Sequence, residues 1–184
     1  MTSRHLAKVL RQMMRSDQTV RLNVSTALAR DGRVSKKLVD AMVSTDGENT
    51  KRLKGIFRGQ GQSLIRQATE SELRAIWLIT QHADHDVKFQ KLVLRLIKPL
   101  IRDKSKAKEH YAYLQDRVLV NEGKPQLFGT QFTQDKHGKP IPHKIRDPQY
   151  LDARRREFGL QPFAEYEKFF HLTPIQQLEE FEKN

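Results

Sequence analysis

Residues 69–86 read TESELRAIWLITQHADHD, and this stretch predicts a helix with one buried face and the position of a candidate site at its end. Thr69 and Glu72 have the spacing of a capping box, which predicts a helix that begins directly after Thr69. Apolar side chains then recur at helical spacing, so one face of the helix is expected to be buried. Gln81 lies one turn beyond Trp77 and continues that face. The helix is therefore expected to carry polar groups to the edge of a core.

The residues that follow the helix supply the candidate catalytic groups. An imidazole has an ordinary pKa of about 6.5, which suits acid and base catalysis near neutrality, and His82 is therefore the expected proton-transfer residue. Either Asp84 or Asp116 is expected to orient it. Residues two apart on a helix point about 200° apart, so Asp84 reaches His82 only if the chain turns after Ala83. The catalytic candidates are thus His82, Asp84 and Asp116.

A second set of side chains offers ligand-binding groups. Guanidinium groups bind carboxylate or phosphate, and amides and hydroxyls supply neutral donors and acceptors. The alternative is an internal network in which Arg117 pairs with an aspartate and the glutamines satisfy the backbone of a hairpin. The candidate substrate-binding residues are Gln81, Arg117, Gln126, Thr130, Gln131 and Arg155.

A metal centre is the other chemistry that this stretch suggests. His82, Asp84 and Asp86 carry ligand types that suit a transition metal. Their spacing differs from that of the His-Glu-x-x-His motif, and Asp86 more simply caps the next helix. We therefore expect no metal and no other cofactor.

The whole chain predicts a mainly α-helical single domain with one small β-hairpin. The hairpin is expected at about residues 125–145, where prolines flank a short strand pattern and a turn. Asp147 is expected to cap the helix that Pro148 begins. We predict separate helices at residues 3–16, 18–28, 35–43 and 49–57. The domain is expected to have three parts. Residues 1–68 form a basic helical N-terminal region, residues 69–170 hold the site-bearing helices and the hairpin, and residues 171–184 form an acidic C-terminal helix.

Charge and composition restrict the function classes. The net charge is +12, and residues 1–68 carry +9 of it, from 14 lysines and arginines against 5 acidic residues. This imbalance predicts weak, salt-sensitive association with nucleic acid, although Phe57 is the one aromatic residue there that could stack on a base. Cysteine is absent, which excludes disulfides and thiolate chemistry. No apolar run is long enough for a membrane span, and we expect a cytoplasmic protein.

Several motifs occur in one order along the chain and resemble a bacterial family that is defined only as a domain of unknown function. The resemblance spans roughly residues 10–168, and its most specific parts are Gln-His-Ala-Asp, Asp-Arg and Gly-Thr-Gln. It implies a shared site and no particular reaction. The chain departs from the family pattern at Gly59-Gln-Gly61, where a Gly-Trp-Pro-like turn is expected. The motifs are Asp17-Gln18-x-x-Arg21, Asn49-x-x-x-Leu53-Lys-x-Ile56, Trp77-x-x-x-Gln81-His82-Ala-Asp84, Asp116-Arg117, Gly123-Lys-x-Gln126-x-Phe-Gly129-Thr130-Gln131 and Arg155-Arg156-x-x-Gly159-Leu-x-Pro162.

Two hypotheses on function follow. The first is a small, metal-independent acid–base enzyme, a hydrolase or lyase, that acts on a polar or anionic small molecule, a nucleotide or a peptide. The second is a binding protein without turnover that uses the basic N-terminal region for nucleic acid, or that sequesters or interacts with another molecule. Loss of function on replacing His82 would favour the first, and loss on reversing the charges of Arg4, Lys8, Arg11 and Arg15 would favour the second.

Overall fold

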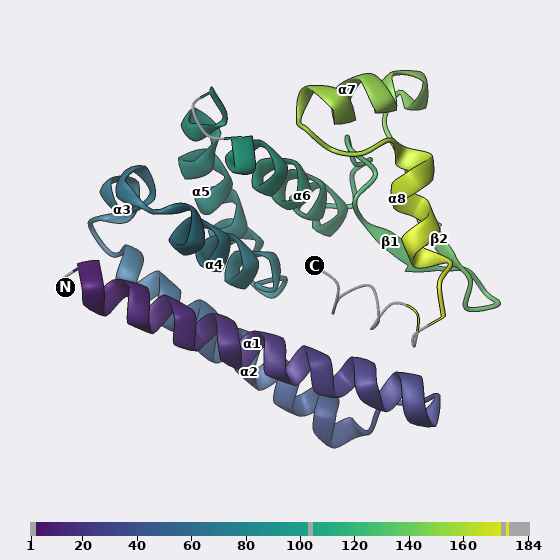
Figure 1. Ribbon diagram of the computed structural model, residues 1–184, viewed down its shortest axis with the longest axis horizontal. Coiled ribbons are helices and arrows are strands. Elements are labelled where there is room, and N and C mark those ends of the chain that lie inside the picture. The colour runs from purple at the N-terminus through teal and green to yellow at the C-terminus, as the bar shows by residue number, and fades with distance from the viewer. Residues whose placement is uncertain (1–2, 103–104, 174–175, 177–184) are drawn as a thin grey trace.

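The computed structural model describes residues 3–102, 105–173 and 176, and it confirms a mainly α-helical fold with one two-stranded hairpin (Figure 1). Side chains from the first six helices share one hydrophobic core. No described helix has the length and apolar character needed to cross a membrane. The elements are α1 (Ser3–Asp31), α2 (Lys36–Phe57), α3 (Gly61–Gln67), α4 (Glu70–Gln81), α5 (Val87–Ile97), η1 (Lys98–Arg102), α6 (Ser105–Asn121), β1 (Phe132–Gln134), β2 (Pro140–Pro142), η2 (Pro148–Tyr150), α7 (Leu151–Glu157) and α8 (Phe163–Phe170).

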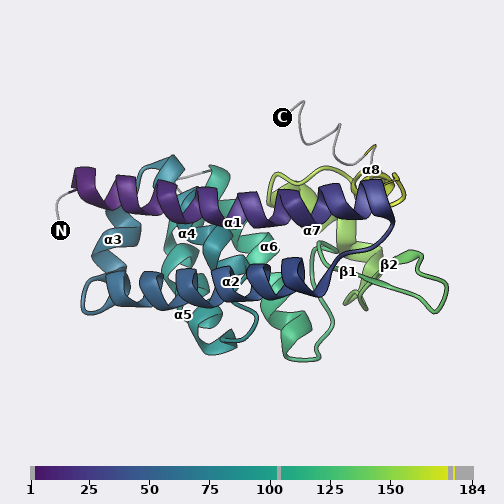
Figure 2. The same ribbon diagram turned by 90° about the horizontal axis from the view of Figure 1, so that it is seen from below.

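Helices α1 and α2 form a long antiparallel pair along one side of the molecule (Figure 2). The prediction of four short helices in this region is wrong, because α1 and α2 each run without a break. Helix α1 holds no glycine or proline, so its backbone has no reason to stop. Helix α2 continues through Gly47 and Gly55, whose cost of about 1 kcal/mol each is offset by packing against α1. The predicted Ser35 cap is confirmed, since its side chain accepts a hydrogen bond from the Leu38 N–H.

Helix α4 lies at the centre of the bundle, in contact with α1, α2, α5 and α6. The predicted capping box is confirmed: Thr69 accepts from the Glu72 N–H, and Glu72 accepts from the Thr69 N–H at 2.9 Å. The helix ends at Gln81, and Asp86 caps α5 as expected by accepting from the Phe89 N–H at 3.0 Å. The short segment between the two helices therefore presents His82 and Asp84 on a fixed turn.

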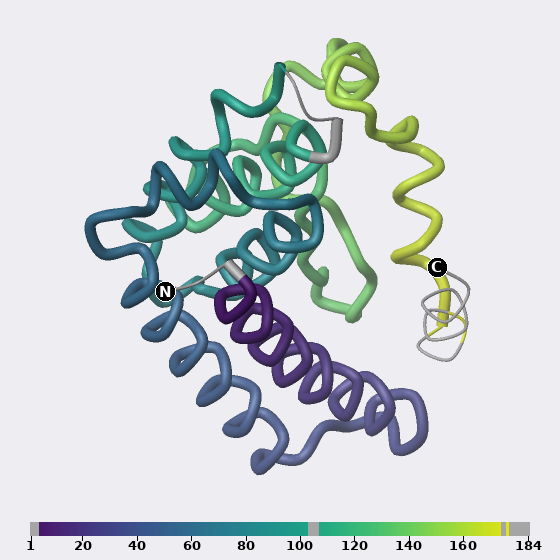
Figure 3. Tube along the Cα trace, turned by 60° about the vertical axis from the view of Figure 1, so that its left-hand side comes forward, coloured from purple at the N-terminus to yellow at the C-terminus, as the bar shows by residue number. Residues whose placement is uncertain are grey.

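The hairpin and the last helices lie on the opposite side of the molecule from α2 (Figure 3). Strands β1 and β2 pair antiparallel, with Phe132 opposite Pro142, and their turn includes Gly138 at φ +79°. Asp147 is not a side-chain cap, contrary to the prediction: its backbone is left-handed at φ +43° and its carboxylate makes no capping hydrogen bond. The acidic C-terminal helix predicted at residues 171–184 lies largely outside the described residues.

Candidate functional site

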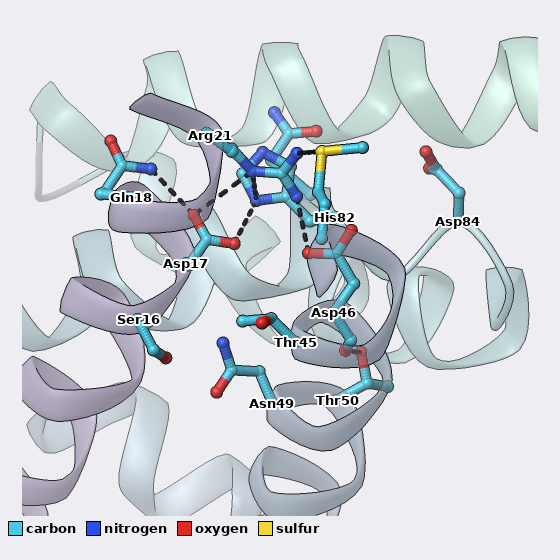
Figure 4. Close-up of polar contacts among 12 residues, drawn as sticks. Ser16, Asp17, Gln18, Arg21, Thr45, Asp46, Asn49, Thr50, His82 and Asp84 are labelled. Carbon is cyan, nitrogen blue, oxygen red and sulfur yellow. Dashed lines mark hydrogen bonds and ion pairs between the residues drawn. The ribbon is translucent and has the colours of Figure 1, made fainter. Parts of the chain in front are cut away.

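The site is organised by a contact between α1 and the end of α4. Asp17 lies halfway along α1, on the same buried face as Leu10 and Met13, and only 1% of its surface is exposed. Its Oδ1 atom lies 2.7 Å from His82 Nδ1 (Figure 4). The carboxylate that orients His82 is therefore Asp17, and not Asp84 or Asp116 as the sequence suggested.

Asp17 remains ionised in this setting. Burial alone would raise its pKa, but the hydrogen bond and charge of His82, together with Gln18 and Arg21, outweigh that effect and hold the pKa of Asp17 below its usual value. Arg21 Nε lies 3.0 Å from His82 Nδ1 and 3.4 Å from Asp17 Oδ2. One ring nitrogen cannot both donate to Asp17 and accept from Arg21. The shorter contact with a buried carboxylate assigns the proton to Nδ1 and leaves Nε2 as the basic nitrogen.

A second carboxylate completes this cluster from α2. Arg21 Nη2 lies 2.6 Å from Asp46 Oδ1, and burial raises the pKa of Asp46 although Arg21 opposes the shift. Ligand atoms of Asp17, Asp46 and His82 lie within 4.8 Å of one another, so these three residues form a group that a metal ion could use. The Arg21 guanidinium already contacts all three and supplies the positive charge there (Figure 4).

The metal site considered from the sequence does not form, because its three residues take different partners. His82 contacts Asp17, whereas Asp86 caps α5 and pairs with Lys54. Asp84 lies apart from His82 (Figure 4) and accepts hydrogen bonds from Arg117. The chain turn after Ala83 thus separates these side chains rather than gathering them.

Arg117 forms a second polar cluster with Asp84. Its Nε donates to Asp84 Oδ1 at 2.8 Å, and its Nη1 donates to Gln131 Oε1 at 3.2 Å. Asn121 and Gln90 also donate to Asp84, at 2.8 and 3.1 Å. Burial opposes ionisation, but the hydrogen bonds and charge of Arg117 and its neighbours lower the pKa of Asp84 to about 2. Asp84 therefore anchors Arg117 in one orientation.

Asp116 and Gln126 hold the hairpin in place. Asp116 accepts hydrogen bonds from the backbone N–H groups of Leu127, Phe128 and Thr130, at 2.7 to 3.1 Å. Burial raises its pKa, and these hydrogen bonds oppose the shift. Gln126 is also buried and bonds to the backbone at Gln131 and His143. The internal-network interpretation describes these two residues, and neither lines the cleft described next.

A cleft of about 920 Å³ lies between α4, α6, the hairpin and α8. Its volume is that of a typical small-molecule site. Aromatic side chains of Trp77, Tyr113, Phe132, Tyr166 and Phe170 form much of its wall, and the sequence analysis did not assign them to a site. Among the sequence-predicted residues, those that line the cleft are Gln81, His82, Arg117, Thr130, Gln131 and Arg155.

Two polar atoms on the α4 wall of the cleft lack hydrogen-bond partners in the described part of the chain. They are the indole Nε1 of Trp77 and the Oε1 of Gln81, and both atoms are buried. Buried polar atoms without partners are uncommon in folded proteins. The two residues are one helical turn apart, so they offer a donor and an acceptor on one face of α4.

Besides the aromatic residues of the cleft, the sequence analysis did not assign the charged residues Asp17, Arg21 and Asp46 to the site. Asp17 carried a signal, because a charged residue at the spacing of the apolar positions Leu10 and Met13 is expected to need a buried partner. Arg21, one turn later, belongs to the same motif. Asp46 carried no signal, because an aspartate on an exposed-looking helix is ordinary.

Fold and site together define a small helical protein with a buried aspartate–histidine pair beside an aromatic-lined cleft. The chain belongs to a family of unknown function (DUF6624), whose model matches residues 4–173. This confirms the family resemblance seen in the sequence. Searches of curated proteins and of solved structures each found no match. The family match includes every residue of the Asp17–His82 pair and of the cleft wall.

Proposed function

We propose that this protein is an enzyme that uses His82 as general base and acid, in a hydrolase or lyase reaction on a small polar or anionic molecule. The observation that carries this proposal is the 2.7 Å hydrogen bond from His82 Nδ1 to the buried Asp17 carboxylate, at an imidazole that lines the cleft. A carboxylate in this position fixes the tautomer of the imidazole and stabilises the imidazolium that forms when the ring takes a proton.

In this mechanism the substrate, or a water molecule beside it, gives a proton to His82 Nε2. No described residue hydrogen-bonds to Nε2, so this nitrogen is left for the reaction. Asp17 remains a carboxylate throughout, because its pKa lies below the usual value. His82 then returns the proton to the leaving group. The residues that would position the substrate are Gln81, Arg117, Thr130, Gln131 and Arg155.

The proposal is metal-independent because Arg21 already provides a positive charge to Asp17 and Asp46. Arg21 also restrains the Asp17 carboxylate, because its Nε lies 3.4 Å from Asp17 Oδ2 while His82 Nδ1 contacts Oδ1, so Arg21 acts as a positioning residue. A cytoplasmic location in a bacterium, expected from the sequence, is part of the same proposal.

Activity screening of matched variants tests this proposal. We expect hydrolysis or elimination on a panel of nitrophenyl esters, nitrophenyl phosphates and β-substituted acids to fall by at least about a hundred-fold in His82→Gln and in Asp17→Asn. His85→Ala is the control, because His85 is exposed and three residues away. Equal activity in wild type and His82→Gln on every active substrate would refute the proposal.

A chemical test needs no substrate. Diethyl pyrocarbonate modifies neutral imidazole, and peptide mass spectrometry gives the rate at each histidine. At a pH where the imidazole is neutral in both proteins, we expect Asp17→Asn to slow the modification of His82, because the Nδ1–H group then faces a neutral amide in place of a carboxylate, while His85 serves as the internal reference. An unchanged ratio of the two rates would show that Asp17 does not activate His82.

A second candidate function rests on the exposed face of α1. Arg4, Lys8, Arg11 and Arg15 are all exposed, and their spacing places them on one side of the helix over about 16 Å. Such a stripe favours weak binding of a nucleic-acid backbone. Fluorescence anisotropy with a labelled duplex is expected to show binding that weakens steeply with salt and is lost when the four charges are reversed. Binding that the reversal leaves unchanged would contradict this function.

A further inference from the structure

Arg155 has the setting of an anion-recognition residue. It is 1% exposed, yet it lines the cleft through the wall that α7 contributes. Its Nε donates to the Gln161 carbonyl at 2.7 Å and its Nη1 donates to the Phe128 carbonyl. No carboxylate of the described residues lies within ion-pair distance of its guanidinium. The two carbonyls thus fix the direction of the guanidinium without neutralising its charge.

A buried charge without an ionic partner is costly, and proteins usually pair it. Burial lowers the pKa of Arg155, in keeping with that cost, although a guanidinium remains charged at neutral pH. Besides the two backbone carbonyls, the Tyr166 ring, 4.8 Å from the guanidinium carbon, partly compensates the charge. The remaining Nη2 group has no hydrogen-bond partner among the described residues. A bound anion would provide both the missing charge and the missing acceptor.

The walls beside Arg155 suit a flat ring. Phe132 and Phe170 stack with their centroids 3.9 Å apart, and Tyr166 packs edge-on to Phe170 at 5.2 Å. Tyr113 on α6 also contacts Trp77 on α4, and the centroids of these two rings lie 6.0 Å apart. Aromatic rings bind one another through such stacked and edge-on contacts. The cleft therefore combines a cation that has no ionic partner among the described residues with several aromatic side chains in its lining.

We infer that the cleft binds a small aromatic anion, a carboxylate or phosphate joined to a planar ring, whose anionic group pairs with Arg155. The inference names a substrate class for the proposed enzyme and so rests on the proposed function. Arg117 is not the primary anion ligand in this assignment, because Asp84 already neutralises it. His82 lines the same cleft and would meet the part of the molecule that reacts.

Trp77 gives a direct readout of binding. It is the one tryptophan in the chain and it lines the cleft, so its fluorescence reports what enters. Three probes separate ring from charge: phenylphosphonate has both, methylphosphonate lacks the ring, and benzyl alcohol lacks the charge. The carbon–phosphorus bond also withstands hydrolysis. We expect phenylphosphonate to bind the wild-type protein about ten- to a hundred-fold more tightly than either of the others.

Variants at Arg155 test its part in that preference. Arg155→Lys keeps a positive charge but loses the paired N–H donors of the guanidinium, and Arg155→Met loses both the charge and the donors. In each variant the ratio of phenylphosphonate affinity to benzyl alcohol affinity should fall about ten-fold or more. Arg156→Lys, at the exposed neighbouring arginine, should leave the ratio unchanged. A purely structural role would change stability without changing this ratio. If Arg155→Met does not fold, the wild-type selectivity and Arg155→Lys decide the question.

The outcomes separate this inference from the proposed function. Equal affinity of the wild type for phenylphosphonate and benzyl alcohol overturns the inference, and so does an unchanged ratio in Arg155→Lys. We expect His82→Gln to retain the binding of phenylphosphonate. Selective binding with no catalysis on any substrate would leave the anion site standing and remove the enzyme proposal. Catalysis by His82 on neutral substrates alone would support the enzyme proposal and remove the anion site.

Discussion

Replacing Asp17 by asparagine removes one negative charge from the buried pair with little change of shape. The hydrogen bond with His82 changes from charge-assisted to neutral, which lowers its contribution by about 1 to 2 kcal/mol. The ion pair with Arg21 adds less than about 1 kcal/mol, because Arg21 is partly exposed and keeps Asp46 as a partner. The free energy of unfolding should fall by about 2 kcal/mol. For a chain of this length that corresponds to about 4 to 8 °C in Tm.

Urea denaturation at pH 7 measures this loss, and a double-mutant cycle with His82→Gln isolates the pair. We expect a coupling free energy of about 1 kcal/mol or more. The folded pKa of Asp17 lies below the usual 3.8, so its stabilisation is present above pH 3.8 and disappears as the pH falls through the folded value. The difference between wild type and variant should therefore shrink in acid. A variant as stable as wild type at pH 7, or a coupling near zero, would refute the contact as a source of stability.

Three further predictions concern the frame of the site, and chemical denaturation measures each. Gly129→Ala should lower the free energy of unfolding by about 2 to 3 kcal/mol, because the residue has φ +69° and an added Cβ would lie 2.8 Å from the Phe163 ring. Gly123 is the control: it has the same φ, an added Cβ there would meet no atom within 4 Å, and Gly123→Ala should cost about 1 kcal/mol. Equal losses would argue against the clash. Asp116→Ala should cost about 3 kcal/mol or more by leaving buried N–H groups of the hairpin loop without an acceptor, and a loss under 1 kcal/mol would show that the loop is held otherwise. Thr69→Ala should cost about 1 kcal/mol through loss of the α4 capping box, and an unchanged free energy of unfolding would contradict that role.

Features of the fold that depend on residues close together in the chain could be predicted from the sequence. The capping residues Thr69, Ser35 and Asp86 act as predicted, because a cap depends on residues three positions apart. The hairpin was likewise predictable from its turn and its prolines. The break expected between residues 16 and 18 was wrong, because polar residues on α1 were read as an interruption while Asp17 faces the interior.

The sequence predicted some of the candidate site residues but not how they pair. The sequence by itself determined that the chain is mainly helical and that a helix with one buried face ends in a polar segment after Gln81, and it named Arg155 as a candidate ligand-binding residue without showing that this side chain is buried. Only the tertiary structure decided that Asp17, and neither Asp84 nor Asp116, faces His82. Periodicity tells which face of a helix is buried, but the partner on the other side, 65 positions away for this pair, depends on how whole helices pack. The aromatic cleft arises in the same way, from side chains that meet only when α4, α6 and α8 come together.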